Sequence, residues 1–493
     1  MSDGREARRD LAVPLLAGVV VLLVAVANIT PHLIGVFFDD GIYALQAKAL
    51  ATGQGFVYPQ LPGTPPAIHY PPAFPLLLAL VWKLAPPFPE STMWLKMVNP
   101  LLLGLAAVLI TRLTMRVLGW SAVASAALVV LGCANVPTLV LTSVLLSEPL
   151  FLAVLAPALL AAGALVERGG PRWAIIAGLA AGIVVLTRTV GGVILPAVLI
   201  VLALERRWRE AATYAAVAFL VILPWQLFVW RHAPGFPDEL RGSYGPYLEW
   251  VIGGYRDGGL ALVWAVFTKN VADAWSFLGI FFSPLVAWLR PIAAALVIVA
   301  AFVGVLLGLA ERTRRVFALT LGAYLCVVFL WPYQIERFLW GAWPFLLVLA
   351  ASGFDAVYRA VQPRRALALG VMAVGVVLAV GHAAYGARGL SRGWAASASQ
   401  RMVDRMLPVV EMAIAEPRLR GQLIASDVAP MLALYTGERV ISLDILEVRD
   451  HLAEKSIPER AAIVARLDRA FEPDAYVLLP NSPVFPAFLR AER

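Results

Sequence analysis

Charged residues are scarce in this chain. Asp, Glu, Lys and Arg make up 15% of its 493 residues, whereas they form about a quarter of an average soluble domain. Hydrophobic residues reach 60%, and the mean hydropathy is +0.79. These values exclude a water-soluble enzyme, a disordered chain and a collagen-like chain. Because apolar runs long enough to enter a bilayer recur along the chain, the sequence predicts an all-α polytopic membrane protein.

Cysteine is nearly absent as well. Cys133 and Cys326 are the two cysteines, and both lie in apolar runs. This excludes a disulfide scaffold and a CxxC metal or redox site. The net charge is +8, but in a membrane protein an excess of Arg usually marks cytoplasmic loops, so we expect no nucleic-acid partner.

The apolar runs predict eleven membrane spans. The first run, 11–30, follows three arginines, which places the N-terminus in the cytoplasm. Residues 25–27 resemble a signal-peptidase site, but the run is long and we expect an uncleaved anchor. Two shorter runs, 73–85 and 276–289, contain or flank Pro and Trp, and we place them flat at the interface. The other ten spans are roughly 98–118, 121–136, 149–166, 173–187, 190–204, 211–230, 291–310, 316–332, 339–357 and 366–385.

The positive-inside rule favours this count, because eleven spans put every basic cluster on the cytoplasmic side. Counting either short run alone as a span would move several clusters outward. The outward segments are then 31–97, 137–148, 231–290, 332–338 and the tail. The clusters are Arg112 and Arg116; Arg168 and Arg172; Arg206, Arg207 and Arg209; Arg312, Arg314 and Arg315; and Arg359, Arg364 and Arg365.

The composition changes near residue 388. The tail is more charged, with short apolar stretches at 423–425 and 475–479 that are typical of strands. Segments 429–435 and 458–471 between them are typical of helices. We therefore predict a transmembrane domain over 1–387, with 31–97 as its first outer loop, and a small extracytoplasmic α/β domain over 388–493.

Two adjacent carboxylates, Asp39 and Asp40, stand at the outer end of the first span. Aspartate close to hydrocarbon is costly and suggests a functional site. Two Asp residues before Gly41 are equally typical of a helix cap, and the sequence leaves both interpretations open. Because adjacent positions do not share a helix face, we expect the two side chains to have different roles.

Further candidates lie in the other outward segments. His69-Tyr70-Pro71-Pro72 is stiffened by its prolines, as in the wall of a site or an ordinary rigid turn. Glu148 precedes Pro149 at the start of a span, where a capping role explains it equally well.

Two arginines, Arg188 and Arg337, lie outward against the general trend. They could simply pair with Glu148 or Glu336. Alternatively, they hold a phosphate group at the membrane surface, which the planar guanidinium suits. Carboxylates and arginines at one membrane face are what transfer from a polyprenyl-phosphate sugar requires. Arginine stabilises the departing phosphate, and a carboxylate accepts the proton of the acceptor hydroxyl. Attack opposite the phosphate inverts the anomeric centre.

An ordered set of motifs resembles the GT-C superfamily of membrane glycosyltransferases. The nearest members are bacterial enzymes similar to protein O-mannosyltransferases and lipid A aminoarabinose transferases. The resemblance covers most of the chain. It is carried by Asp39-Asp40-Gly41-Ile42-Tyr43 with Ala47 and Gly53-Gln54-Gly55, by His69-Tyr70-Pro71-Pro72, by Ser147-Glu148-Pro149-Leu150, by Glu336-Arg337-Phe338 with Pro344, and by Ile424-Ala425-Ser426-Asp427 through Tyr435-Thr436-Gly437.

The resemblance implies roles for these residues. Asp39 matches the catalytic carboxylate, and Asp40 replaces a more usual Glu. Glu148 matches the acidic residue of the second outer loop, and Arg337 matches the arginine for the lipid phosphate. Tyr70 stands where the aminoarabinose branch often has Lys, which argues against that substrate. The predicted site is therefore catalytic Asp39, Asp40 and Glu148; phosphate-binding Arg337, Arg188 and Tyr70; and wall or acceptor residues His69, Tyr43, Tyr333 and Glu336.

The leading hypothesis is an inverting glycosyltransferase of the bacterial inner membrane. It moves a monosaccharide from a polyprenyl-phosphate donor to a lipid, glycan or protein acceptor on the outer face. The resemblance implies that no cofactor is required, although Mg²⁺ or Mn²⁺ at Asp39 and Asp40 is an alternative. A transporter or flippase of lipid-linked sugars, expected to carry charges near mid-bilayer, and a non-catalytic scaffold are the other two classes.

Overall fold

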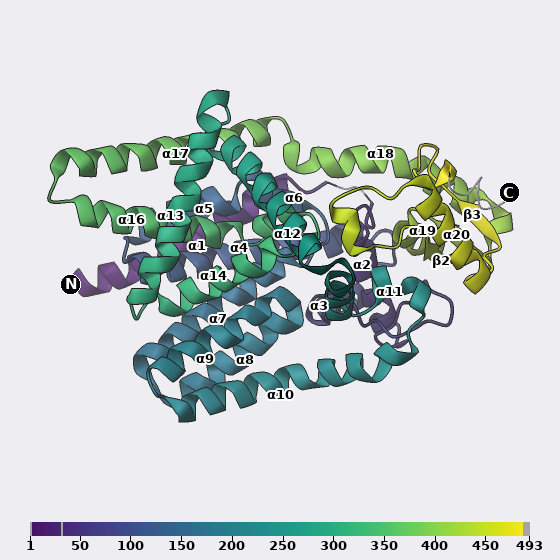
Figure 1. Ribbon diagram of the computed structural model, residues 1–493, viewed down its shortest axis with the longest axis horizontal. Coiled ribbons are helices and arrows are strands. Elements are labelled where there is room, and N and C mark those ends of the chain that lie inside the picture. Colours follow the sequence, from purple (N-terminus) through teal and green to yellow (C-terminus); the bar gives the residue numbers. More distant parts are fainter. Residues whose placement is uncertain (1, 31–32, 487–493) are drawn as a thin grey trace.

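The computed structural model describes residues 2–30 and 33–486. Helices form most of the chain, and a small sheet lies at the end of the molecule away from the N-terminus (Figure 1). Within the described residues, six helices are long and apolar enough to cross a membrane. They are α4 (Thr92–Leu118), α7 (Glu148–Arg168), α10 (Trp208–His232), α13 (Arg290–Ala310), α16 (Trp343–Val361) and α17 (Arg365–Ser391).

A bent pair adds a seventh candidate. Helices α5 (Ala122–Cys133) and α6 (Val136–Ser143) meet at 58°. Every predicted span overlaps one of these helices or a shorter apolar one, so the positions of the helices are confirmed, while eleven crossings stay a prediction. The shorter helices are α1 (Ser2–Ala27), α8 (Pro171–Thr187), α9 (Ile194–Leu204) with the 3-10 turn η1 (Thr189–Val193), and α14 (Arg315–Phe329).

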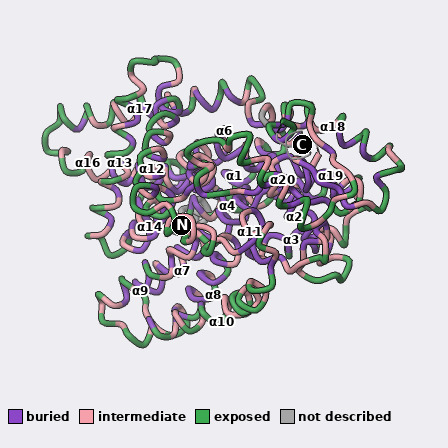
Figure 2. Tube along the Cα trace, turned by 45° about the vertical axis from the view of Figure 1, so that its right-hand side comes forward, coloured by how far each residue is buried: buried purple, intermediate pink, exposed green. Residues whose placement is uncertain are grey.

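Lipid contact explains the outer helices. Helices α10 and α17 lie at the periphery, where exposed residues dominate (Figure 2). Leu220 on α10 and Val377 on α17 are each 64% exposed. Contiguous apolar exposure of this kind is rare on a soluble protein and normal against lipid. The chain is therefore a multi-pass membrane protein.

The two short runs behave differently from each other. Run 73–85 forms a separate helix, α3 (Ala73–Leu84). Run 276–289 does not, because residues 276–282 are the end of the long helix α12 (Tyr247–Phe282), which breaks at Gly259. Pro284 disfavours helical backbone at Ser283, so α12 ends there. The placement of both runs flat at the membrane interface stays a prediction.

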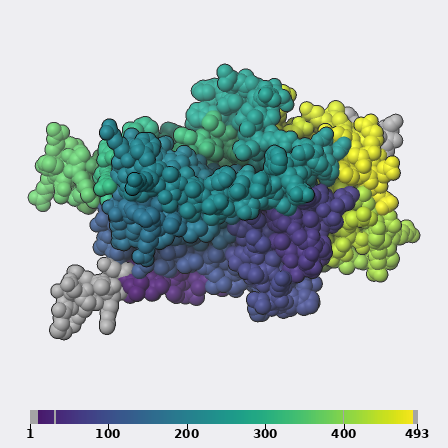
Figure 3. Space-filling view, turned by 90° about the horizontal axis from the view of Figure 1, so that it is seen from below, coloured from purple at the N-terminus to yellow at the C-terminus, as the bar shows by residue number. Residues whose placement is uncertain are grey.

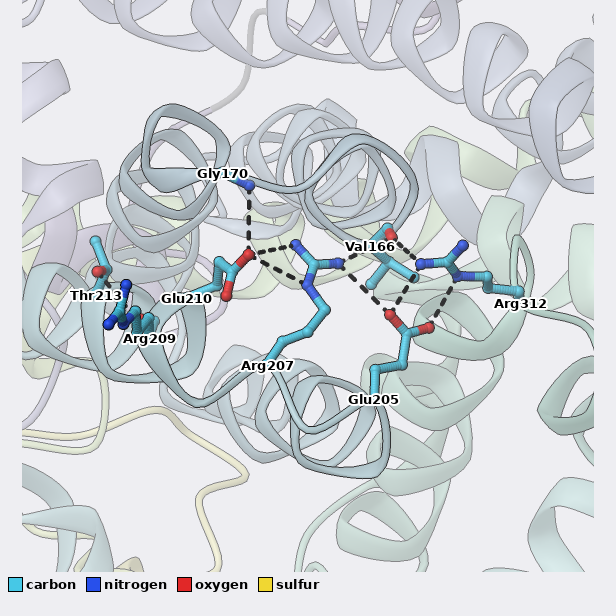
Figure 4. Close-up of polar contacts among 8 residues, drawn as sticks. All are labelled: Val166, Gly170, Glu205, Arg207, Arg209, Glu210, Thr213 and Arg312. Atoms are coloured by element: carbon cyan, nitrogen blue, oxygen red, sulfur yellow. Dashed lines mark hydrogen bonds and ion pairs between the residues drawn. The ribbon is translucent and has the colours of Figure 1, made fainter.

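Two of the predicted cytoplasmic arginine clusters meet in one network (Figure 4). Arg207 Nη2 lies 3.1 Å from Glu210 Oε1, and Arg312 Nη2 lies 3.0 Å from Glu205 Oε2. Both arginines also donate to the carbonyl of Val166, at the end of α7. The network gathers at the turn between α9 and α10, at the end away from the sheet in Figure 1. It therefore agrees with placing these clusters on one side of the membrane.

The tail contains a three-stranded parallel sheet in the order β2-β1-β3. The predicted strands and helices are confirmed as β1 (Leu423–Ser426), α19 (Ala429–Thr436), α20 (Ile457–Phe471) and β3 (Ala475–Val477). Strand β2 (Arg439–Ser442) and helix α18 (Trp394–Ala415) were not predicted. Helix α17 continues to Ser391, past residue 387. The division of the chain into two domains at residue 387 stays a prediction.

The tail shares one hydrophobic core with the first outer loop. Ile42 and Tyr58 of the loop lie in the same buried cluster as Leu432 and Ile441 of the tail. Figure 3 shows the loop (dark purple) directly against the tail (yellow). A Cβ on Gly35 would lie 2.7 Å from Met431 Cα, so glycine, at φ +98°, permits this close approach. The packing fixes the loop that carries Asp39 and Asp40.

Candidate functional site

Asp39 and Asp40 begin helix α2 (Asp39–Ala51), and their side chains have different partners. The Asp40 carboxylate is buried and accepts hydrogen bonds from the backbone N–H groups of Gly35, Val36 and Phe37, at 2.8, 3.1 and 2.8 Å. Burial raises the pKa of Asp40, and these donors oppose the rise. Asp40 therefore holds the turn before α2 and does not line the site cavity.

The Asp39 carboxylate is bound at both oxygens. Tyr70 Oη donates to Oδ1 at 2.5 Å, and Arg337 Nη1 lies 2.6 Å from Oδ2. Arg337 belongs to α15 (Ile335–Gly341), about 300 residues further along the chain. The structure thus brings together the predicted base, the predicted phosphate arginine and Tyr70.

Glu148, the first residue of α7, forms ion pairs with both Arg188 and Arg337. Its Oε1 is 2.9 Å from Arg337 Nε and 2.7 Å from Arg188 Nη1, and the residue is 1% exposed. A Cβ on Gly341 would lie 2.8 Å from Glu148 Cγ, so glycine lets α15 approach this closely. Glu148 therefore fixes both guanidinium groups without facing the cavity.

Arg188 is held by a second set of contacts. Its Nη1 donates to Ser147 Oγ at 3.1 Å, and that hydroxyl lies 3.2 Å from Tyr43 Oη. Its guanidinium also lies 5.5 Å from the ring of Phe338. The sequence suggested pairing with Glu148 or Glu336, and Glu148 is the partner. Among the described residues Glu336 makes no ion pair.

Except for Asp40, Glu148 and Glu336, these side chains line a cavity of about 390 Å³, which we call the Asp39 cavity. Its polar wall includes Asp39, Arg188 and Arg337, and much of its apolar wall comes from the 3-10 turn η1, the start of α12 and the end of α14. The cavity is therefore amphipathic, as a lipid-linked polar ligand requires. The predicted site residues in its lining are Asp39, Tyr43, His69, Tyr70, Arg188, Tyr333 and Arg337; Asp40, Glu148 and Glu336 are not in the lining.

His69 forms part of this wall through contacts that the sequence did not reveal. Its Nδ1 lies 2.5 Å from the carbonyl oxygen of Gly245, and its ring centroid lies 3.8 Å from that of Tyr247, with 37° between the planes. Burial lowers the pKa of His69 to about 4, so the ring is neutral at physiological pH. Sequence reasoning missed Tyr247, Trp250 and Trp331, although all three lie in or beside segments predicted to face outward, and it gave Ser147 a place in a motif but no role in the site.

No group of three or more His, Cys, Asp or Glu side chains gathers in a metal-binding arrangement within residues 2–30 and 33–486. Asp39 and Asp40, the two carboxylates proposed as metal ligands, are directed to different partners.

The fold is similar to that of solved membrane glycosyltransferases. ArnT from Cupriavidus metallidurans bound to undecaprenyl phosphate is 16% identical, with a TM-score of 0.57, and the match covers 92% of this chain and 90% of that one. The apo state of the same enzyme is 14% identical, with a TM-score of 0.50 and the same coverage. No protein-family model and no curated protein sequence matches the chain.

The Archaeoglobus fulgidus oligosaccharyltransferase in its apo form is a third similar structure. It is 13% identical, with a TM-score of 0.53 over 88% of this chain and 64% of the archaeal one. Both kinds of enzyme are GT-C glycosyltransferases. The chain therefore has the GT-C fold that its motifs indicated.

Proposed function

We propose that this protein is an integral-membrane glycosyltransferase. It moves a monosaccharide from a polyprenyl-phosphate donor to a lipid, glycan or protein acceptor, with inversion. One observation carries the proposal: Asp39, Arg337 and Arg188 face a single amphipathic cavity, and two of the three are in direct contact. The GT-C fold supports it, since the similar ArnT structure is bound to undecaprenyl phosphate.

The donor phosphate binds to Arg337 and Arg188 in this proposal. Arg337 Nη1 then exchanges the Asp39 carboxylate for a phosphate oxygen, which frees Asp39 Oδ2. Tyr70 continues to donate to Oδ1 and keeps the carboxylate in place. Glu148 and Asp40 act as positioning residues, the first for both arginines and the second for the turn before Asp39.

The transfer itself needs one base and no general acid. The acceptor hydroxyl oxygen attacks the anomeric carbon while its proton passes to Asp39. The bond between the anomeric carbon and the phosphate oxygen breaks, and polyprenyl phosphate leaves with the electron pair. Arg337 and Arg188 stabilise its charge. Attack from the opposite face inverts the anomeric centre.

Neither a divalent metal nor another cofactor is part of the proposal. Both Asp39 oxygens are already engaged by protein groups, and two arginines are available for the phosphate. We also propose that the site faces outward from a bacterial inner membrane, with the N-terminus in the cytoplasm and the tail extracytoplasmic. The arginine network at the opposite end of the molecule supports this orientation (Figures 1 and 4).

The test is turnover of synthetic polyprenyl-phosphate monosaccharides by purified protein in detergent, with EDTA or with added Mg²⁺. Released polyprenyl phosphate and transferred sugar are measured separately. We expect turnover of one donor regardless of EDTA. Asp39→Asn should lose about 10²–10⁴-fold in rate, because an amide cannot accept the proton. Asp257→Asn, at an exposed position on α12, is the matched control.

Two results would contradict the proposal. The first is full activity of Asp39→Asn, which would remove the base. The second is transport of an intact fluorescent donor across vesicles without cleavage of any donor, which is the behaviour of a flippase.

A further inference from the structure

A second cavity, of about 690 Å³, adjoins the Asp39 cavity. It shares Tyr333, Arg337 and Leu446 with the Asp39 cavity, so these three residues form a common wall. Its other walls come from α6, from α12 and from the short 3-10 helix η6 (Val448–His451) of the tail. Figure 1 shows α6 and α12 beside this part of the tail.

The two cavities differ in charge. The Asp39 cavity has two arginines against one aspartate in its lining. The second cavity has four carboxylates, Asp273, Glu336, Glu447 and Asp450, against Lys269 and Arg337. Burial and the nearby Lys269 lower the pKa of His451, so that ring adds no positive charge at neutral pH.

Most of these charges are already paired. Lys269 Nζ lies 2.7 Å from Asp273 Oδ2, and Asp450 is bound by Lys455, whose side chain is buried. Arg337 is committed to Asp39 and Glu148. Within the described part of the chain, Glu336 and Glu447 remain without an ion-pair partner, so the second cavity has an excess of negative charge.

The cavity also has an apolar side. Val140 and Leu141 of α6, with Val144, Leu146 and Trp340, form this wall. Helix α6 is half of the bent pair that is apolar enough to cross a membrane. An occupant of this space therefore meets lipid-like surface on one side and carboxylates on the other.

We propose that the second cavity binds the acceptor, and that the acceptor is a lipid whose hydroxyl-bearing head group carries no negative charge. This rests on the proposed function. A phosphorylated head group would meet Glu336 and Glu447 at close range, where like charges repel. A neutral or amine-bearing head group hydrogen-bonds to these carboxylates, while its chain lies along α6. Its hydroxyl reaches the donor sugar at the common wall of Tyr333 and Arg337.

The test uses three matched acceptors: an alkyl glucoside, its 6-amino derivative and its 6-phosphate derivative. Release of polyprenyl phosphate reports on the donor reaction separately from transfer. We expect the neutral and amine-bearing lipids to have kcat/KM at least about tenfold above the phosphate, with the difference in acceptor KM. Glu336→Gln with Glu447→Gln should largely remove this preference and leave donor KM unchanged. Glu454→Gln, an exposed glutamate of the tail outside the cavity, is the matched control.

A second measurement does not depend on turnover. The alkyl glucoside carrying a diazirine in its chain should label residues 140–146, and its 6-phosphate derivative should label them several times less. Preference for the phosphate, or a preference unchanged in the double variant, would overturn the proposal. So would a serine-bearing peptide that outcompetes every lipid. Absence of donor cleavage with all acceptors would instead refute the proposed function, and labelling would then decide whether the cavity binds the lipid.

Discussion

Arg337 connects both site carboxylates, so its replacement tests the geometry of the site without any substrate. Its Nη1 lies 2.6 Å from Asp39 Oδ2 and its Nε lies 2.9 Å from Glu148 Oε1, with 18% of the arginine side chain exposed. Arg337→Ala removes both contacts. Glu148 keeps Arg188 at 2.7 Å, but Asp39 keeps only the hydroxyl of Tyr70.

The expected cost follows from the Asp39 pair. Removing one partner of a buried ion pair destabilises a protein by about 3–5 kcal/mol, because a charge is left without compensation. Asp39 is 13% exposed, so we expect the lower part of this range. Asp39→Asn in the same chain removes the unpaired charge. The double variant should then be more stable than the sum of the single effects implies, by about 1–3 kcal/mol.

The assay is thermal unfolding in detergent without donor, on wild type, both single variants and the double variant. Arg256→Ala, at an exposed position of α12, controls for the loss of a positive charge. Strictly additive effects, or an unfolding temperature of Arg337→Ala equal to that of the control, would refute the described contact between Arg337 and Asp39. In the functional assay, unchanged donor affinity in Arg337→Ala would remove its phosphate role.

Two further predictions concern the surroundings of Asp39. Asp40→Ala leaves the N–H groups of residues 35–37 without their acceptor, so we expect a loss of unfolding free energy of at least about 1–3 kcal/mol; full stability in a chemical denaturation series would contradict the positioning role. His69 has a folded-state pKa of about 4, below the value of about 6.5 in an unfolded chain. The neutral His69 ring therefore contributes fully to the free energy of unfolding above pH 6.5. This contribution is lost as the pH falls towards 4, by up to about 1.4 kcal/mol per pH unit. His69→Gln does not titrate, so its unfolding temperature should fall less than that of wild type between pH 7 and pH 5; parallel curves would disprove this assignment.

Hydropathy and charge predicted the helices and several site residues, because both signals are local. Apolar runs located the helices, and the outward positions of Arg188 and Arg337 singled them out before any geometry was known. Tyr247 carried no comparable signal, since its importance depends on the convergence of distant segments. Asp40 was given a catalytic role because sequence does not show which way adjacent side chains turn at the start of a helix. The four-residue strand β2 was too short for its pattern to indicate a strand.

The shared core of the first outer loop and the tail has a consequence for biogenesis. The N–H of Ile34 donates to the hydroxyl of Tyr435, about 400 residues later, and Gly35 packs against Met431. During synthesis the loop therefore emerges long before the surface that it needs for packing. Residues 33–97 must therefore wait, without their packing partner, until the last hundred residues have been synthesised. A nonsense mutation near the 3′ end of the reading frame would thus leave this early loop without the surface that it packs against. Cellular quality control would then recognise the exposed loop, far in sequence from the mutation.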